Sequence, residues 1–151
     1  MHRQLQDHWQ LTLAYLTESQ AIAIYQAECA VLRLSQFSPE RGQSLALCGE
    51  IMQEEREHEK HLLHWYTPGW PVRLYSYPNA FLGFLVGLAL ALLPGRLCWR
   101  LHVIAEIQAA QTYARTANLL KHAEPELLRF LHEASSQEKL HADRFEKLLS
   151  G

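Results

Sequence analysis

The chain has 151 residues, 48% of them hydrophobic and 20% charged, and its formal net charge is -2. This size suits one domain over residues 1–151 that can bury a core of its own. The nearly balanced charge excludes a broadly basic surface of the kind that binds nucleic acids.

Two long helices are predicted in the first half of the chain. The first runs to about Leu34, because apolar residues recur at steps of three to four: Leu11, Tyr15, Ile22, Tyr25 and Cys29. Ser38-Pro39 is a helix-start signal, an N-cap residue followed by proline at the first helical position. The second helix is expected to continue to about Trp65.

The second half begins with a strong stop signal at Thr67 to Pro71. We expect an extended connection to Tyr77-Pro78 that crosses the bundle, and then a helix from Asn79 to about Lys121 with a kink at Pro94-Gly95. A last helix should run from Pro125 to about Leu149. This order predicts four helices with a long crossover between the second and the third.

No charged residue occurs between Arg73 and Arg96, and Ala80 to Leu93 is almost entirely apolar. A membrane-spanning helix needs about 20 apolar residues, whereas Pro78 and Pro94 leave only about 15 between them, so we expect no span. Two explanations stay open. The segment either enters the core, or it forms an apolar surface that rests on a membrane or lines an entry for a lipid-like substrate.

Two copies of Glu-x-x-His stand in the sequence, Glu55 to His58 and Glu138 to His141. A Glu and a His three residues apart lie on one helix face with Cβ atoms about 5–6 Å apart, so both can reach one metal ion. A solitary glutamate in an apolar stretch precedes each copy, Glu18 before the first and Glu106 before the second. This is the ligand set of ferritin-like di-iron bundles.

The spacing of these residues from the predicted turns supports a single site. With a turn near Gln36, Glu18 and Glu55 both lie about 27–28 Å from it. With a turn near Ala123, Glu106 and Glu138 differ in height by only about 3 Å. We therefore expect an all-α, ferritin-like antiparallel four-helix bundle with its ligands at one level.

In this hypothesis six side chains hold two metal ions. Glu18, Glu55 and His58 hold one, and Glu106, Glu138 and His141 hold the other, with Glu55 and Glu138 the better candidates for bridging both. Carboxylate and imidazole ligands suit iron.

Several other acidic residues and histidines are not expected to be metal ligands. Glu28 lies about 15 Å along the helix from Glu18 and should not be a ligand. The run Glu54, Glu57 and Glu59 is interpreted as a solvated face, and His61 and His64 as surface residues. His102 is either a satisfied core histidine or an outer contact of the site.

The chain resembles the demethoxyubiquinone hydroxylases, the ferritin-like di-iron enzymes of ubiquinone biosynthesis. The first ligand helix has Ile24-Tyr25-Gln26 and Ala30-Val31-Leu32 after Glu18. Gly83-Phe84, Gly87, Ala91 to Leu93 and Gly95 are similar to the family's apolar segment before its third ligand helix. Tyr113 follows Glu106 by seven residues, and Thr112 stands where the family commonly has a histidine.

The resemblance implies a monooxygenase that uses two iron ions (Fe2+/Fe3+) and dioxygen to hydroxylate a demethoxyubiquinol-like, lipophilic quinol, with Tyr113 as a candidate catalytic residue. An external electron donor would be needed, because no nucleotide-binding signature is present. The apolar segment Ala80 to Leu93 would provide peripheral membrane contact. Its surplus apolar surface is also compatible with a homodimer.

The three cysteines, Cys29, Cys48 and Cys98, form no Cys-x-x-Cys pair, and Met1 to Asp7 lacks the apolar core of a secretory signal. Both features favour a reduced, cytoplasmic setting, with the inner face of the cell membrane as the expected place of contact.

Three alternatives stay open: a ferritin-like iron oxidase or storage protein, a rubrerythrin-like peroxidase, and a helical binding module without activity. The peroxidase family typically adds a Cys-x-x-Cys module. A binding module would leave Glu18 and Glu106 unpaired among apolar neighbours, at a substantial desolvation cost.

Overall fold

The computed structural model describes residues 2–34 and 39–150, and within these ranges the chain forms five helices and no strand. The helices are α1 (His2–Leu34), α2 (Pro39–Trp65), α3 (Trp70–Ala91), α4 (Gly95–Leu119) and α5 (Pro125–Ser150). The predicted all-α class is confirmed. Helix α2 begins at Pro39, whereas the predicted turn at Gln36 and the predicted cap at Ser38 lie outside the described residues.

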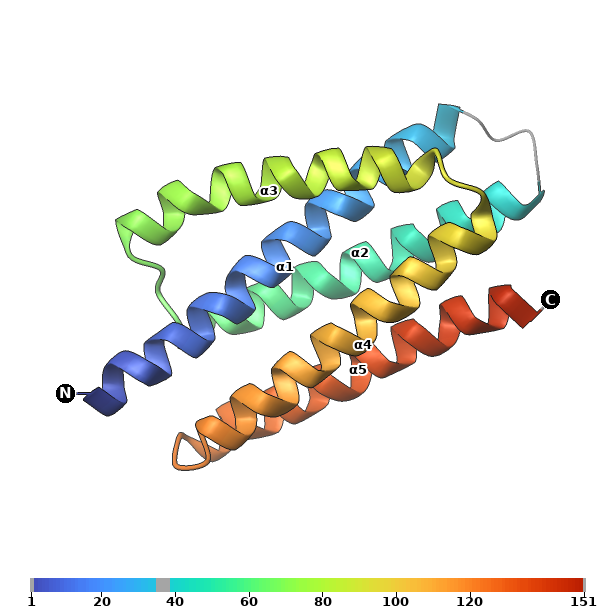
Figure 1. The fold of residues 1–151 in the computed structure, drawn as a ribbon. Helices are drawn as coiled ribbons and strands as arrows, with labels where there is room; N and C mark the ends of the chain where they lie inside the picture. The colour runs from blue at the N-terminus through green and yellow to red at the C-terminus, as the bar shows by residue number, and fades with distance from the viewer. Residues whose placement is uncertain (1, 35–38, 151) are drawn as a thin grey trace.

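The helices form two antiparallel hairpins, α1–α2 and α4–α5, with α3 packed along α1 (Figure 1). Helix α1 contacts α4 only sparingly, so the two hairpins meet along a looser seam than the one within each hairpin. The first and last described residues lie at opposite ends of the bundle.

The predicted extended connection before Pro78 is wrong, because α3 is helical from Trp70. Pro71 lies in the first turn, where a missing backbone N–H leaves no bond unmade. Pro78 lies inside the helix, at a usual cost of about 3 kcal/mol. Packing on α1 offsets this cost, since α3 lies along α1 and the Asn79 amide donates to the Leu16 carbonyl at 2.8 Å.

The predicted kink at Pro94-Gly95 is a reversal of the chain. Helix α3 ends at Ala91, α4 begins at Gly95, and α4 runs back along the bundle in the opposite direction (Figure 1). Pro94 is the N-cap of α4, where its ring does not interrupt a helix. The crossover between the two hairpins that carry the predicted ligands is therefore itself a helix, α3.

Helix α3 buries small residues and exposes large apolar ones. Its buried residues are Ser76, Gly83, Gly87 and Ala91. A Cβ atom at Gly87 would lie 2.2 Å from the Ile24 carbonyl oxygen, so glycine permits the close approach of α3 to α1. The outward face carries exposed Leu74, Tyr75, Tyr77, Phe81, Leu82, Phe84, Leu85 and Val86. The alternative in which this segment enters the core is therefore wrong.

By length and composition α3 could cross a membrane, because it has 22 residues and is predominantly apolar. The expectation that its prolines leave too short an apolar stretch is wrong, because the helix continues through Pro78. Core helices of soluble proteins can be as long and as apolar, but such helices are mostly buried. Only 17% of the apolar stretch of α3 is buried.

Two apolar clusters fill the bundle on either side of its middle. One includes Leu11, Leu62, Tyr113, Leu120 and Leu131. The other includes Tyr25, Ile51, Met52, Trp99 and Phe145. Between them lies a layer of buried carboxylates and imidazoles.

Candidate metal centre

All six predicted ligand residues meet in the middle of the bundle, and each is at most 5% exposed. They come from α1, α2, α4 and α5 and form two overlapping groups, in each of which the donor atoms lie within 4.8 Å of one another. The first group is Glu18, Glu55, His58 and Glu138, and the second is Glu55, Glu106, Glu138 and His141. Glu55 and Glu138 belong to both groups, as bridging ligands would.

Both histidines turn Nδ1 toward the carboxylates. His58 Nδ1 lies 3.1 Å from Glu138 and 3.4 Å from Glu55. His141 Nδ1 lies 3.2 Å from Glu138 and 3.5 Å from each of Glu55 and Glu106. Ligands bound to one ion at about 2.0–2.2 Å are separated by similar distances. The donors of each group are therefore close enough together to bind one ion.

The other nitrogen of each ring is held by a polar side chain outside the donor groups. His141 Nε2 lies 2.6 Å from Glu54, and Arg144 holds the same carboxylate through both terminal nitrogens at 3.1 Å. His58 Nε2 contacts the side-chain oxygen of Gln137. Such partners orient a ligating imidazole and tune its basicity.

For Glu54 the predicted solvated face is therefore wrong. Its neighbour Glu57 is exposed and pairs with Lys60, as that prediction describes.

Two buried tyrosines cross the bundle to reach the glutamates of α1 and α4. Tyr113 of α4 donates to Glu18, and Tyr25 of α1 donates to Glu106. The sequence predicted a role at the site for Tyr113, whereas it placed Tyr25 in the apolar stripe and in the motif that resembles the family's first ligand helix, without a role at the site. The common spacing of seven residues from Glu18 to Tyr25 and from Glu106 to Tyr113 could have identified it.

Burial dominates the electrostatics of the site. It raises the pKa of Glu18 well above its ordinary value, with a further contribution from the Glu55 charge. It also raises the pKa of Glu106 to about 7, although a hydrogen bond with His141 opposes the shift. For Glu55 and Glu138, burial acts in the same direction, but hydrogen bonds with both histidines outweigh it and lower the pKa.

The pKa of each histidine of the site is raised by the neighbouring carboxylates, although burial acts to lower it. Burial lowers the pKa of a histidine, but hydrogen bonds with Glu138 and Glu55 outweigh it at His58 and raise the pKa to about 10. At His141, hydrogen bonds with Glu106 and Glu138 outweigh burial and raise the pKa to about 12. Without metal, protons on these rings offset the negative charge of Glu55 and Glu138, whose pKa is lowered.

Three buried atoms of the site, Glu18 Oε2, His58 Nδ1 and Glu138 Oε1, make no well-aligned hydrogen bond among the described residues, although His58 Nδ1 and Glu138 Oε1 lie 3.1 Å apart. An unsatisfied buried polar atom costs about 1–3 kcal/mol. All three residues belong to one donor group, so one cation would satisfy them together. Four carboxylates and two imidazoles match the charge of two divalent ions, and these residues could therefore hold metal.

Comparisons with known proteins were made with protein-family models, curated proteins and solved structures. None of them matches the chain. The chemistry of the site is therefore argued from its own side chains.

A cavity of about 290 Å³ lies along the seam between α1 and α4 and reaches the site. Its inner wall includes Glu18, Glu55, Glu106 and Glu138. Its outer wall is formed mainly by small, apolar and neutral polar residues: Thr17, Gln20, Ala21, Ile24, Ala105, Gln108, Ala109 and Thr112. This cavity gives a small molecule a route to the carboxylates.

The other histidines and acidic residues considered in the sequence analysis lie outside the two donor groups, as predicted. His61 and His64 are exposed. Glu28 lies outside both donor groups of the centre and pairs with His102. His102 is thus a satisfied core histidine, and it also stacks on Tyr25 with ring centroids 5.1 Å apart, which links it indirectly to Glu106.

Proposed function

We propose that the protein is a di-iron monooxygenase that hydroxylates a demethoxyubiquinol-like, lipophilic quinol. The observation that carries the proposal is the pair of buried donor groups that share Glu55 and Glu138. One Glu from each of two helices with Glu-x-x-His from each of two others is the ligand set of ferritin-like di-iron proteins. We accordingly assign the four ligand-bearing helices to a ferritin-like bundle.

Iron suits this site because all its ligands are carboxylates and imidazoles. A pair of bound ferrous ions would supply electrons to dioxygen at open coordination positions. Glu18, Glu55 and His58 would hold one ion, and Glu106, Glu138 and His141 the other.

The protein's own contribution is to position and shield this chemistry. Glu54 and Gln137 hold the two imidazoles with Nδ1 inward. Tyr25 and Tyr113 hold Glu106 and Glu18 in place. Tyr113 is not among the residues that line the cavity between α1 and α4, so we assign it a positioning role, and its catalytic role stays a prediction.

The lipophilic substrate is inferred from the surface around this cavity. Helix α3 packs on α1 and exposes large apolar side chains, and α4 adds exposed Leu97, Leu101, Ile104 and Ile107. An exposed apolar surface of this extent on a soluble bundle is typical of a membrane or lipid contact. We propose that α3 rests on the inner face of the cell membrane and that a quinol passes from the bilayer into the cavity. Electrons would come from an external donor.

The test is iron loading combined with oxygen consumption. Iron-reconstituted protein should hold about two irons per chain and consume oxygen when a reduced short-tailed quinol is added. Iron uptake far beyond two per chain would indicate storage instead. Peroxide consumption without quinol dependence would indicate a peroxidase.

Variants make the test specific to the shared ligands. Glu138→Ala should lose both irons, because Glu138 belongs to both groups, whereas Glu18→Ala should affect mainly one. Glu133→Ala on the same helix is the matched control, since Glu133 is exposed and pairs only with Arg129 in the described contacts. A Glu138→Ala protein with unaltered iron content would refute the assignment.

A further inference from the structure

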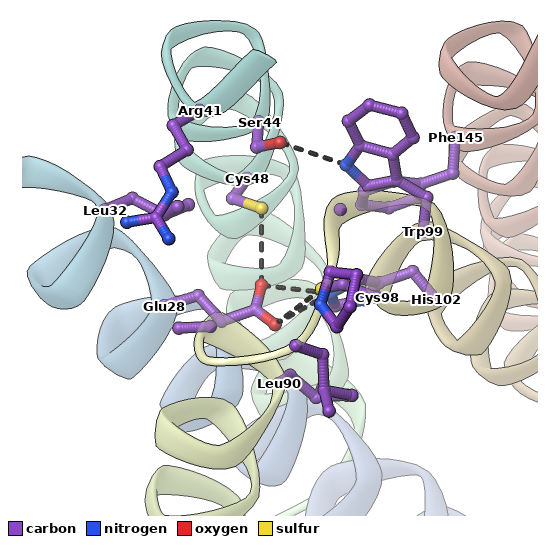
Figure 2. A pocket seen from close by; sticks show the side chains of 14 residues that line it. Glu28, Leu32, Arg41, Ser44, Cys48, Leu90, Cys98, Trp99, His102 and Phe145 are labelled. Carbon is purple, nitrogen blue, oxygen red and sulfur yellow. Dashed lines mark hydrogen bonds and ion pairs between the residues drawn. The ribbon is translucent and has the colours of Figure 1, made fainter. Parts of the chain in front are cut away.

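A second group of metal-binding side chains lies outside the two-metal centre, in a cavity of about 290 Å³ (Figure 2). Glu28 comes from α1, Cys48 from α2, and Cys98 and His102 from α4. Glu28, Cys48 and His102 are at most 3% exposed, and Cys98 is partly exposed. None of the four belongs to either donor group of the two-metal centre.

The Glu28 carboxylate is the common partner of the other three side chains. His102 Nε2 lies 2.9 Å from each of its oxygens. Cys48 donates to one oxygen at 3.3 Å, and Cys98 to the other at 3.6 Å. The donor atoms of Glu28, Cys98 and His102 all lie within 4.8 Å of one another. Figure 2 shows these side chains converging on one point from three helices.

These separations are close to those of a tetrahedral metal site. With bonds of about 2.3 Å to sulfur and about 2.0–2.2 Å to nitrogen and oxygen, neighbouring zinc ligands lie about 3.3–3.8 Å apart. The distances from Glu28, at 2.9, 3.3 and 3.6 Å, differ from these edges by a few tenths of an ångström. Cys48 lies outside the compact group of Glu28, Cys98 and His102, so its thiol would have to turn toward the other three donors to complete the set around an ion.

The histidine of this cluster is held rigidly. Its ring stacks between Tyr25, at a centroid distance of 5.1 Å, and Phe145, at 4.5 Å, with interplanar angles of 13° and 9°. This clamp keeps Nε2 directed at Glu28. On the adjoining wall, the Trp99 indole N–H donates to the Ser44 hydroxyl at 3.0 Å, which ties α4 to α2. A ligand set on rigid supports favours metal binding, since little ordering remains to be done.

We propose that Glu28, Cys48, Cys98 and His102 form a mononuclear zinc site, separate from the two-metal centre. Two thiolates, one imidazole and one carboxylate complete a closed tetrahedral set, which is typical of structural zinc. Soft thiolate ligands select zinc over the metals that prefer oxygen, whereas the neighbouring centre offers only oxygen and nitrogen. The two sites of the bundle would thus select different metals, zinc at the thiolate site and iron at the two-metal centre.

The charges in the cavity are consistent with a bound dication. Two thiolates and a carboxylate bring three negative charges, so a zinc ion leaves a net charge of about -1. Arg41 lines the same cavity and offsets that charge (Figure 2). In the metal-free state, burial and the Glu28 charge raise the pKa of both thiols, which keep their protons and donate them to Glu28.

The competing explanation is a purely structural network in which Glu28 accepts hydrogen bonds from His102 and the two thiols. Cobalt distinguishes the two, because Co2+ bound to thiolate shows a sulfur-to-metal charge-transfer band that oxygen and nitrogen ligands cannot produce. Iron-loaded wild-type protein, kept reduced, should develop this band with one equivalent of Co2+ and lose it when Zn2+ is added. No band would overturn the proposal.

Cysteine variants assign the band to this cavity. Cys98→Ser and Cys48→Ser should each strongly reduce it. Cys29→Ser should retain it, because Cys29 is buried but does not line the cavity. An undiminished band in Cys98→Ser, or an equal loss in a folded Cys29→Ser, would overturn the assignment.

A measurement on wild-type protein covers the case in which these variants fail to fold. After iron loading, one equivalent of Zn2+ should show sulfur neighbours at about 2.3 Å by X-ray absorption. Neighbours of oxygen and nitrogen alone would refute the site. Because the readout is zinc–sulfur bonding, its failure leaves the di-iron proposal standing, and failure of quinol-dependent oxygen uptake leaves the zinc site standing.

Discussion

Tyr25 of α1 donates a hydrogen bond across the bundle to Glu106 of α4. The reverse contact, Tyr113 to Glu18, joins the same two helices. In both helices the tyrosine follows the glutamate by seven residues, or about two turns. Each hairpin therefore supplies the hydroxyl that holds the other hairpin's carboxylate.

Helices α2 and α5 make a similar pair of reciprocal contacts. The residue before each Glu-x-x-His motif, Glu54 in one and Gln137 in the other, contacts the histidine of the opposite motif. The centre is thus built from two equivalent halves, each incomplete without the other. Metal binding should consequently couple the α1–α2 hairpin to the α4–α5 hairpin.

Tyr25→Phe is expected to weaken metal binding about tenfold to hundredfold, as the loss of an outer contact to a ligand usually does. The phenyl ring keeps the packing, so the helical content should not change. Metal titration with a competing chelator measures the effect. Tyr75→Phe serves as the control, because Tyr75 is 60% exposed on α3. Equal affinities in the two variants would mean that the hydroxyl of Tyr25 does not support the site.

Glu54→Gln should lower metal affinity at the His141 side by about tenfold or more, because a neutral amide orients and polarises the imidazole less than a carboxylate does. Glu57→Gln, three residues further along α2, is the matched control, since its side chain is 60% exposed and faces Lys60. The two variants can be compared by metal content after dialysis. If both keep the same content, Glu54 has no part in the centre.

The convergence of the six ligands could be predicted from the sequence because it depends on rise per residue and distance from the turns. The contacts of Glu54 and Gln137 could not be predicted in the same way. Their contacts depend on the rotation of one hairpin against the other, which a pattern within one helix does not specify.

The error at α3 has a different physical origin. Proline signals at Pro71 and Pro78 indicated an extended segment, yet the packing of α3 on α1, with the hydrogen bond from Asn79 to Leu16, keeps the helix continuous. Tertiary packing outweighed a local preference of about 3 kcal/mol.

Metal binding should release protons and become tighter as pH rises. In the metal-free protein the pKa of His58 is about 10 and that of His141 about 12, both above the ordinary value of 6.5. Each raised pKa stabilises the metal-free fold fully below pH 6.5, and this contribution is lost as pH rises through the folded value. At pH 7.5 both rings hold protons that a metal must displace.

A pH indicator in weakly buffered solution should therefore register about two or more protons released per pair of ions bound. Exposed His61 and His64 provide an internal control, because His61→Gln and His64→Gln should leave the proton count unchanged. Binding without proton release would contradict the proposed ligands.

Gly87→Ala should destabilise the protein by about 1–3 kcal/mol, because the new Cβ would lie 2.2 Å from the Ile24 backbone oxygen and force α3 away from α1. Gly49→Ala is the matched control within α2. A Cβ there meets no atom within 4 Å, and removing a helical glycine should stabilise by about 0.5–1 kcal/mol. Urea unfolding curves should thus shift in opposite directions, and a shift of both in the same direction would contradict the close packing of α3.

Replacing Phe81 and Leu85 by serine should reduce binding to lipid vesicles. These side chains are 63% and 46% exposed on α3, and each would contribute about 1.5–3 kcal/mol if buried in acyl chains, so their loss should weaken binding by tenfold or more. Leu140→Ser on α5 controls for general loss of apolar surface, since Leu140 is 56% exposed outside α3. Flotation of wild-type protein and both variants with vesicles measures the difference. If wild-type protein does not float, or all three float equally, α3 is not the membrane contact, whereas metal binding would be unaffected because no ligand lies on α3.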